Sequence, residues 1–517
     1  MSASGGAADR HSGAICIVTG ELAGPDYNGG IGTSNRGLAI ALSRAGFKVD
    51  ILYTRVDGGK PFSARGTFEN QVAAFARHGI NLSCIYHDGR WNDWGAKSHH
   101  ALQHILGHSY DVVFFDDTHG NGYLPALAKR TGLAALKSTT IVVVAHSATQ
   151  WIFDANQSGL RSVEDVRLME MERRSIELAD VLIAPSAYIL ARYRGYGWSF
   201  PSRVVVQPNI VLDEVPPRRQ TRHADIREFV FFGRLEDRKG LWTLCDAIDR
   251  IKYRIPSTAI TFLGKTTLED GISTGAKLVR RMATWPFPAS ILSTYDRDQA
   301  LDYLRGSNRL AVMPSREDNS PSVILECLHN EIPFIASSGS GGEELIAPQS
   351  QAEVLFRPAA RDLADKLLAV RSAGIDRASP AFTFSENADR YLSLVKSLVE
   401  QPSADLHRST PVSERFKTAV IGFVPERLQP HRAADMIEAA ARQYDETAEI
   451  SVVAESEAAA TAIEAILGTG RFHFYGPSSY ARLTDELALG PDRVVCLCYV
   501  PQLPSPEWLV RAADALA

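Results

Sequence analysis

Short apolar runs rich in β-branched residues alternate with helical patterns along most of this chain. Such alternation is typical of parallel sheets that helices cover on both faces. The first series of predicted strands comprises Ala14–Thr19, Val49–Thr54, Asp111–Phe115, Thr140–Ala145, Val181–Pro185 and Arg203–Gln207. The second series comprises Glu228–Phe232, Ala259–Leu263, Ala289–Ser293, Arg309–Met313, Pro333–Ala336 and Ala352–Phe356. Two series of similar length predict an α/β protein with two Rossmann-like domains that face each other across a cleft.

Length and polar stretches predict how the chain is divided. The chain has 517 residues, and a domain takes about 100–200 residues, so about three domains are expected. Glu214–His223 ("EVPPRRQTRH") has the composition of a hinge. We predict a first domain at residues 13–212, a second at 224–381, a closing helix at 382–401, a polar linker at 402–416 and a small α/β domain at 417–517.

Composition and charge favour a cytoplasmic protein without a nucleic-acid partner. The net charge of −5 provides no basic field that would attract nucleic acid. The six cysteines lie mostly in apolar runs without metal-ligand spacing, which suits free thiols in a reducing compartment. Met1–Ser12 lacks the apolar core of a signal peptide, and no run of about 18 apolar residues predicts a membrane span. Arg192–Trp198 ("RYRGYGW") mixes basic and aromatic residues, so peripheral membrane contact stays open beside the simpler interpretation of a helix end.

Loops that follow the strands are the candidate site, because ligands of open parallel sheets bind outside the carboxyl ends of the strands. After the first predicted strand, Gly29, Gly30 and Gly32 would let the backbone approach a ligand. Thr33 would then cap the next helix, whose N-terminus favours anions. A plain flexible loop is the alternative.

Two histidines occupy comparable positions after predicted strands. His146 follows Thr140–Ala145, and His119 follows the run that ends in Asp116 and Asp117. Each histidine either faces the cleft or serves as a core or capping residue. The two aspartates have the composition of a turn rather than of a catalytic pair.

The segment "FFGRLEDRKG" places two cations around the start of a helix. A strand ends at Gly233, Arg234 follows, and Lys239 precedes Gly240 at the predicted helix start. Arginine binds phosphate as a bidentate fork and lysine as a point charge. The segment therefore predicts a cradle for a pyrophosphate, with solvated surface charges as the alternative.

The segment "PSREDNSPSVILE" combines a polar loop with an apolar helix. Ser320 and Pro321 predict a helix that starts with a serine cap. Glu326 in its second turn can bind a vicinal diol, as acids bind ribose. Asp318 in the loop would lie near a sugar beyond the phosphates. Taken alone, either acid could equally be a solvated surface group.

Taken together, these motifs resemble those of a known family. In order they are "NGGIG", "AHS", "VVVQPN", "GRLEDRKG", "PSREDNSPSVILE", "FIASSGSGGEELI" and "FTFSE". Residues 14–401 resemble a family-four retaining glycosyltransferase with the two-domain GT-B fold.

The resemblance implies roles for residues on both domains. The implied donor-binding residues are Gly30, Gly32, Arg234, Lys239, Asn319, Ser320 and Glu326. His146 and Asp318 are implied to act at the donor sugar, and His119 is a further candidate. The family needs no metal and no other cofactor, because two cations and a helix dipole stabilise the leaving diphosphate.

One position departs from the family pattern. The first acid of the motif is usually glutamate, and here the aligned residue is Asp318, which follows Glu317. Either the donor sugar sits differently, or Glu317 supplies the longer side chain.

The last hundred residues weakly resemble the first half of a family-two glycosyltransferase. In that family a strand ends in an Asp-x-Asp motif that holds a divalent metal. Here the aligned residues are Tyr499, Val500, Pro501 and Gln502, without an acid. We therefore predict a degenerate or truncated accessory domain.

The function predicted from these features is metal-independent, retaining transfer of a sugar from an NDP-sugar to a glycan, lipid-linked or small-molecule acceptor. The alternatives are a nucleotide-sugar epimerase on the same fold and an inactive transferase-like scaffold. Homo-oligomerisation and a location at the inner face of a membrane also remain open.

Overall fold

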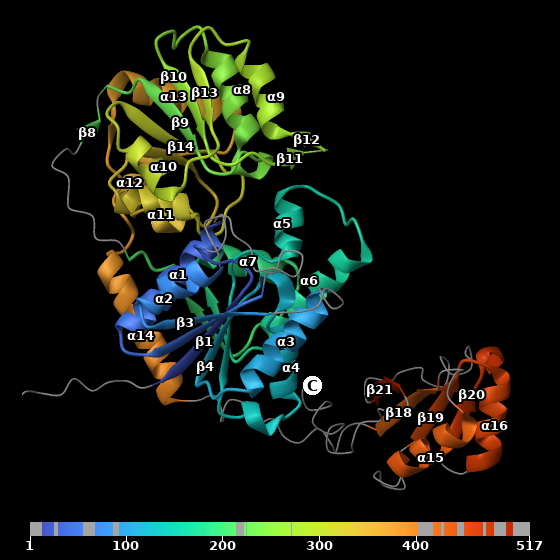
Figure 1. The fold of residues 1–517 in the computed structure, drawn as a ribbon. Helices are drawn as coiled ribbons and strands as arrows, with labels where there is room; N and C mark the ends of the chain where they lie inside the picture. Colours follow the sequence, from blue (N-terminus) through green and yellow to red (C-terminus); the bar gives the residue numbers. More distant parts are fainter. Residues whose placement is uncertain are drawn as a thin grey trace, which may run out of the picture. The chain divides into compact units, whose positions relative to one another are not determined.

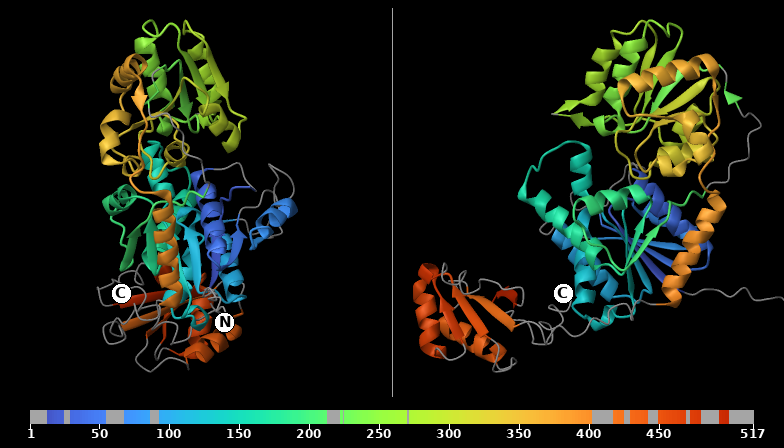
Figure 2. Two further views of the ribbon diagram at one scale, coloured as in Figure 1. Left: turned by 90° about the vertical axis from the view of Figure 1, so that its left-hand side faces the viewer. Right: turned by 180° about the vertical axis from the view of Figure 1, so that it is seen from behind.

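A computed structural model describes residues 13–24, 29–54, 68–85, 93–212, 222–223, 225–269, 271–401, 417–424, 429–441, 449–468, 472–479 and 493–499. The chain divides into two compact units, residues 1–126 with 138–403, and residues 404–517 with 127–137. In the first unit, helices cover both faces of two separate sheets (Figures 1 and 2).

The first sheet has seven parallel strands in the order β3-β2-β1-β4-β5-β6-β7. They are β1 (Ala14–Thr19), β2 (Lys48–Tyr53), β3 (Ile80–Cys84), β4 (Val112–Asp116), β5 (Thr140–Val144), β6 (Val181–Ala184) and β7 (Arg203–Val206). The helices between them are α1 (Gly30–Arg44), α2 (Phe68–Ala76), α3 (Trp94–Leu106), α4 (Tyr123–Arg130), α5 (Thr149–Ala155), α6 (Val163–Leu178) and α7 (Ala187–Gly195). The central strands are apolar without alternation because both faces are buried.

The second sheet has six parallel strands in the order β13-β10-β9-β14-β15-β16. They are β9 (Glu228–Phe232), β10 (Ala259–Leu263), β13 (Ala289–Leu292), β14 (Arg309–Met313), β15 (Phe334–Ser337) and β16 (Leu355–Phe356). Its helices are α8 (Leu241–Ile251), α9 (Thr274–Met282), α10 (Arg297–Leu304), α11 (Ser322–His329), α12 (Pro348–Val354) and α13 (Ala360–Ala373). Two short antiparallel pairs accompany it, β11 (Leu268–Glu269) with β12 (Ile272–Ser273) and β8 (Arg222–His223) with β17 (Ile375–Asp376).

Helix α14 (Phe384–Glu400) follows the second sheet domain but packs on the first (Figure 2). Tyr391, Val395 and Leu398 are buried in the core of the first sheet domain. The amide of Gln207 donates to Asn387 Oδ1 over 2.8 Å, so the "VVVQPN" segment holds this helix. The first sheet domain is therefore completed by a segment from the other end of the unit.

The second unit contains a parallel sheet in the order β20-β19-β18-β21. Its strands are β18 (Lys417–Val424), β19 (Glu449–Ala454), β20 (Phe472–Tyr475) and β21 (Arg493–Tyr499), with helices α15 (Pro430–Ala441) and α16 (Glu457–Leu467). Tyr499 ends β21, and residues 500–502 lie outside the described residues.

One predicted strand was wrong. The predicted strand Ala352–Phe356 is mostly the end of α12, because Pro348 starts a helix that continues to Val354. The segment Arg192–Trp198 is the end of α7 and the turn after it, which confirms the simpler interpretation. Its Tyr193 and Trp198 are 0% and 6% exposed, and their rings pack with centroids 4.5 Å apart. The predicted linker, and most of the predicted hinge, lie outside the described residues.

A chain that ends at Gln401 should fold, whereas one that ends at Phe382 should not. The shorter chain exposes the pocket of Tyr391, Val395 and Leu398, each worth about 1.5–3 kcal/mol when buried, which together approach the whole stability of a domain. Thermal unfolding followed by circular dichroism separates the two. Cooperative melting of the shorter chain at the temperature of the longer one would contradict this role of α14.

Candidate active site

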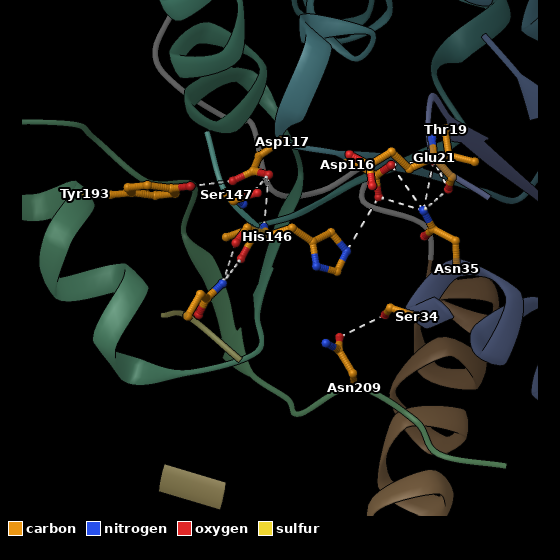
Figure 3. Close-up of polar contacts among 12 residues, drawn as sticks. Thr19, Glu21, Ser34, Asn35, Asp116, Asp117, His146, Ser147, Tyr193 and Asn209 are labelled. Atoms are coloured by element: carbon orange, nitrogen blue, oxygen red, sulfur yellow. Dashed lines mark hydrogen bonds and ion pairs between the residues drawn. The ribbon is translucent and has the colours of Figure 1, made fainter. Parts of the chain in front are cut away.

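The loop after β5 carries His146, whose side chain is 7% exposed. Its imidazole Nε2 lies 3.5 Å from Asp116 Oδ1, and its backbone N–H donates to Asp117 Oδ1 over 2.9 Å (Figure 3). Burial lowers the pKa of His146 to about 4, so the ring is neutral at pH 7. His146 is thus a fixed, uncharged polar group at a strand end.

Asp116 is the last residue of β4, whereas Asp117 lies at the bend that follows, as the sequence suggested, and both are buried. Asp116 accepts hydrogen bonds from Thr19 Oγ1 over 2.6 Å and Asn35 Nδ2 over 3.1 Å. Burial raises its pKa to about 8, against the effect of these two donors. Asp117 accepts from Tyr193 OH over 2.5 Å, and burial raises its pKa to about 6.

His119 adopts a left-handed conformation, with φ at 67°. The His119 ring stacks on Trp94 with centroids 5.0 Å apart, and the backbone N–H of His119 donates to Glu172 Oε1 over 2.9 Å. Glu172 also accepts from the N–H of Thr149, so it joins the loops after β4 and β5. His119 therefore lies beside the loop of His146, held by a buried acid that sequence reasoning missed.

The two glycines of the first loop have different surroundings. Gly30 is exposed at the start of α1, and a Cβ there would lie 3.4 Å from Ser322 Oγ on the second domain. Gly32 is buried, and a Cβ there would lie 3.0 Å from the backbone nitrogen of Ala23. Gly30 thus faces the first residue of α11, whereas the absence of a side chain at Gly32 lets the loop pack closely against Leu22 and Ala23.

Lys239 and Asp318 form a buried ion pair between the loops after β9 and β14. Lys239 Nζ lies 2.5 Å from Asp318 Oδ2. Burial lowers the pKa of Lys239, and Asp318 opposes that shift. Burial alone would raise the pKa of Asp318, but Lys239 and then Arg238 bring it below its usual value, so Asp318 is ionised at pH 7.

Arg234 and Arg238 add positive charge to the same segment. The guanidinium of Arg234 is about half exposed and lies 3.3 Å from Glu236 Oε1. Arg238 is buried, donates to the Glu317 carbonyl over 3.1 Å, and lies 5.3 Å from the ring centroid of Trp151. The sequence analysis did not single out Arg238, because it assigned the two cations of this segment as Arg234 and Lys239.

Helix α11 begins differently from the prediction. Pro321 occupies the cap position and no side-chain cap is formed, while Ser320 Oγ is buried without a hydrogen-bond partner among the described residues. The uncapped N-terminus keeps the partial positive charge of the helix available to an anion.

Glu326, in the second turn of α11, is buried and paired. Its Oε1 accepts from Arg297 Nε over 2.7 Å. Arg297 opens α10, and the sequence offered no signal for this pair because the two residues lie on separate helices.

Glu317 does not lie beside Asp318 as a longer substitute. Its Oε2 accepts from Tyr188 OH over 2.8 Å and lies 3.4 Å from Arg192 Nη2, both on α7 of the first domain. Glu317 therefore contacts α7 here, and its assignment to the donor sugar stays a prediction.

The two loop sets have complementary chemistry. The second domain offers cations and a helix N-terminus, which suit an anion, while the first offers a neutral imidazole and buried carboxyl groups. Within the described ranges, no group of three or more His, Cys, Asp or Glu side chains is arranged to hold a metal ion.

Two parallel-sheet domains of this strand order, with a helix that returns to the first and charged loops at the strand ends, define the GT-B class of glycosyltransferases. The model of Glycosyltransferase Family 4 matches residues 28–214, and that of Glycosyl transferases group 1 matches residues 226–372. The chain belongs to these GT-B glycosyltransferases. It is 24% identical over 391 residues to glycogen synthase of Mycobacterium tuberculosis, covering 69% of this chain and 84% of that protein.

Solved structures support the fold. Sucrose-phosphate synthase from Thermosynechococcus elongatus superposes with a TM-score of 0.50 and 17% identity, covering 75% of this chain and 97% of that one. The catalytic domain of starch synthase IV from Arabidopsis thaliana, bound to ADP and acarbose, has a TM-score of 0.50 and 13% identity, covering 75% and 100%. Across the described segments, no helix is both long enough and apolar enough to cross a membrane.

Asp116→Asn should weaken the dependence of stability on pH between pH 6.5 and 8. The folded chain keeps a proton on Asp116, with its pKa near 8, that the unfolded chain has lost, so unfolding free energy falls as pH rises. Removing this carboxyl should remove about 2 kcal/mol of that fall. Urea unfolding of both proteins at several pH values measures it, and equal slopes would contradict the raised pKa.

Proposed function

We propose that this chain is a retaining glycosyltransferase that takes its sugar from an NDP-sugar without a metal ion. The observation that carries the proposal is the group of Arg234, Arg238 and Lys239 beside the uncapped N-terminus of α11. Cations and helix N-termini at a water-excluded site stabilise a leaving diphosphate. The starch synthase structure contains ADP, a ligand of the class we propose.

The roles of the remaining groups follow from their positions. Lys239 and Arg234 bind the diphosphate, while Asp318 orients Lys239 and accepts a hydrogen bond from a sugar hydroxyl. His146, neutral and fixed by Asp117, accepts or donates a hydrogen bond at the donor sugar on the opposite domain. Glu326 accepts from the ribose hydroxyls.

The reaction we propose breaks the bond between the anomeric carbon and the diphosphate oxygen. The acceptor hydroxyl oxygen forms its new bond to that carbon on the face from which the diphosphate departs. Its proton passes to a phosphate oxygen, and the NDP leaves. No side chain of the chain need act as the base, which agrees with the pKa of His146 near 4, because such an imidazole is a weak base.

The acceptor is proposed as a class. The glycogen synthase relative and the acarbose-bound starch synthase support a glycan acceptor, and a lipid-linked or small-molecule acceptor remains within the proposal.

A panel of NDP-sugars, each tested with EDTA, with and without glycan acceptors, tests this function. We expect NDP release that an acceptor stimulates and a product that keeps the donor's anomeric configuration by NMR. Release of a free epimeric sugar without acceptor would indicate the epimerase. NDP binding without turnover of any donor would indicate a scaffold, and turnover only with added metal would contradict the proposed cradle.

Glu326→Gln should weaken NDP binding, whereas His146→Ala should mainly lower turnover. Hydrogen bonds to a charged group contribute roughly 1.5–3 kcal/mol, so the Glu326 change should cost about ten-fold to a hundred-fold in affinity. Calorimetry with NDP and initial rates separate the two effects.

Glu228→Gln is the matched control for Glu326→Gln. Glu228 also pairs with an arginine, Arg309, over 2.7 Å, but at the amino ends of β9 and β14, away from the site. Unchanged NDP affinity in Glu326→Gln, or an equal loss in Glu228→Gln, would contradict the ribose assignment.

A further inference from the structure

We infer that the Asn319 side chain is a positioning residue that fixes His146 relative to Asp318 across the two domains; the inference deepens the proposed function. Asn319 directly follows Asp318, and its side chain is 4% exposed. Its Nδ2 donates to the backbone carbonyl of Ala145 over 2.8 Å and to that of His146 over 2.7 Å. The carboxamide of Asn319 therefore joins the loop that carries Asp318 to the loop that carries His146.

The orientation of this carboxamide follows from its partners. The two carbonyl oxygens can only accept hydrogen bonds, so the NH₂ group must face them. Its Oδ1 then faces Ser186 Oγ over 2.5 Å, and this hydroxyl donates. Every polar atom of the side chain has a partner on the first domain, so Asn319 leaves no side-chain donor for a ligand.

Further contacts from the second domain converge on the N-terminus of α7, where Ser186 is the cap residue. The carboxylate of Glu344 accepts from the N–H groups of Ala187 and Tyr188, both over 2.7 Å. Glu317 accepts from Tyr188 OH. We call this set, with Asn319 and Ser186, the α7 clasp.

The clasp is also tight in space. A Cβ on Gly341 would lie 1.6 Å from the carbonyl oxygen of Asn319 and 2.8 Å from Ser186 Oγ. Only glycine allows the loop after β15 to close over Asn319, so Gly341→Ala should spread the clasp. The N–H of Gly341 also donates to the carbonyl of Asp318 over 2.9 Å, so this variant displaces the Asp318 backbone as well.

The first test compares Asn319→Ala with wild type. We expect kcat to fall at least ten-fold while NDP affinity changes less than three-fold, because small misplacement of a reacting pair is costly and the diphosphate cradle is intact. Gly341→Ala should lower kcat as well. Asn387→Ala, which removes another buried asparagine that joins a later segment to the first domain, should lower the melting temperature with a smaller effect on kcat.

The second test uses Asn319→Asp and pH. A carboxylate would face the carbonyls of Ala145 and His146 without a proton to donate, so kcat at pH 8 should fall below that of Asn319→Ala. As pH falls, the protonated carboxyl can donate to one carbonyl, and kcat should recover relative to Asn319→Ala at the same pH. A merely structural contribution predicts no such recovery in samples that remain folded by circular dichroism.

Hydrogen exchange separates this inference from the proposed function. In Asn319→Ala, the amides of Ala187 and Tyr188 should exchange faster than in wild type, whether or not any donor is turned over. Faster exchange with no wild-type transfer would leave the clasp standing and overturn the glycosyltransferase proposal. Unchanged exchange, or an unchanged kcat in an active enzyme, would overturn the positioning role.

Discussion

The ion pair between Lys239 and Asp318 is the interaction on which the arrangement of the strand-end loops of the second domain depends. Two buried charges must compensate each other, since an unpaired one costs several kcal/mol. The pair forms only because β9 and β14 are neighbours in the sheet and their loops approach closely. Gly240 allows this approach: its φ is 78°, and a Cβ there would lie 1.9 Å from the carbonyl oxygen of Pro314. The ion pair thus depends both on the order of the strands in the sheet and on the glycine at position 240.

The first domain fixes its loops by a different means. Asp117 and Glu172 are buried carboxyl groups whose partners are N–H and O–H donors rather than arginine or lysine. Such donors hold the backbone around His146 in place without adding positive charge, and burial keeps its imidazole neutral. Positive charge is therefore concentrated on the second domain. An anion would be drawn to that side of the site, while the imidazole of His146 on the other side stays uncharged.

The sequence predicted the strands and the positions of the motifs better than it predicted the side-chain contacts between distant segments. Strands β1, β9, β10 and β14 have the predicted bounds, because fully buried parallel strands are continuous apolar runs. The motif residues were placed on loops at strand ends, as parallel topology requires. Contacts between distant segments could not be predicted: nothing in "EDNSP" shows that Glu317 turns to Tyr188. The prediction that Ser320 caps α11 was wrong, because Pro321 occupies the cap position.

The pairing of Glu326 with Arg297 bears on how a carboxylate on an apolar helix could bind ribose. Without a cation, a carboxylate buried to this degree would be costly as an anion and would tend to take up a proton. Arg297, over 2.7 Å, favours the charged form. An ionised carboxylate is an acceptor with about four lone-pair sites, so a guanidinium and a ribose hydroxyl need not compete for it. Arg297 would then stay in place when a nucleotide binds, and the proposed ribose contact would be made by a carboxylate that is already oriented.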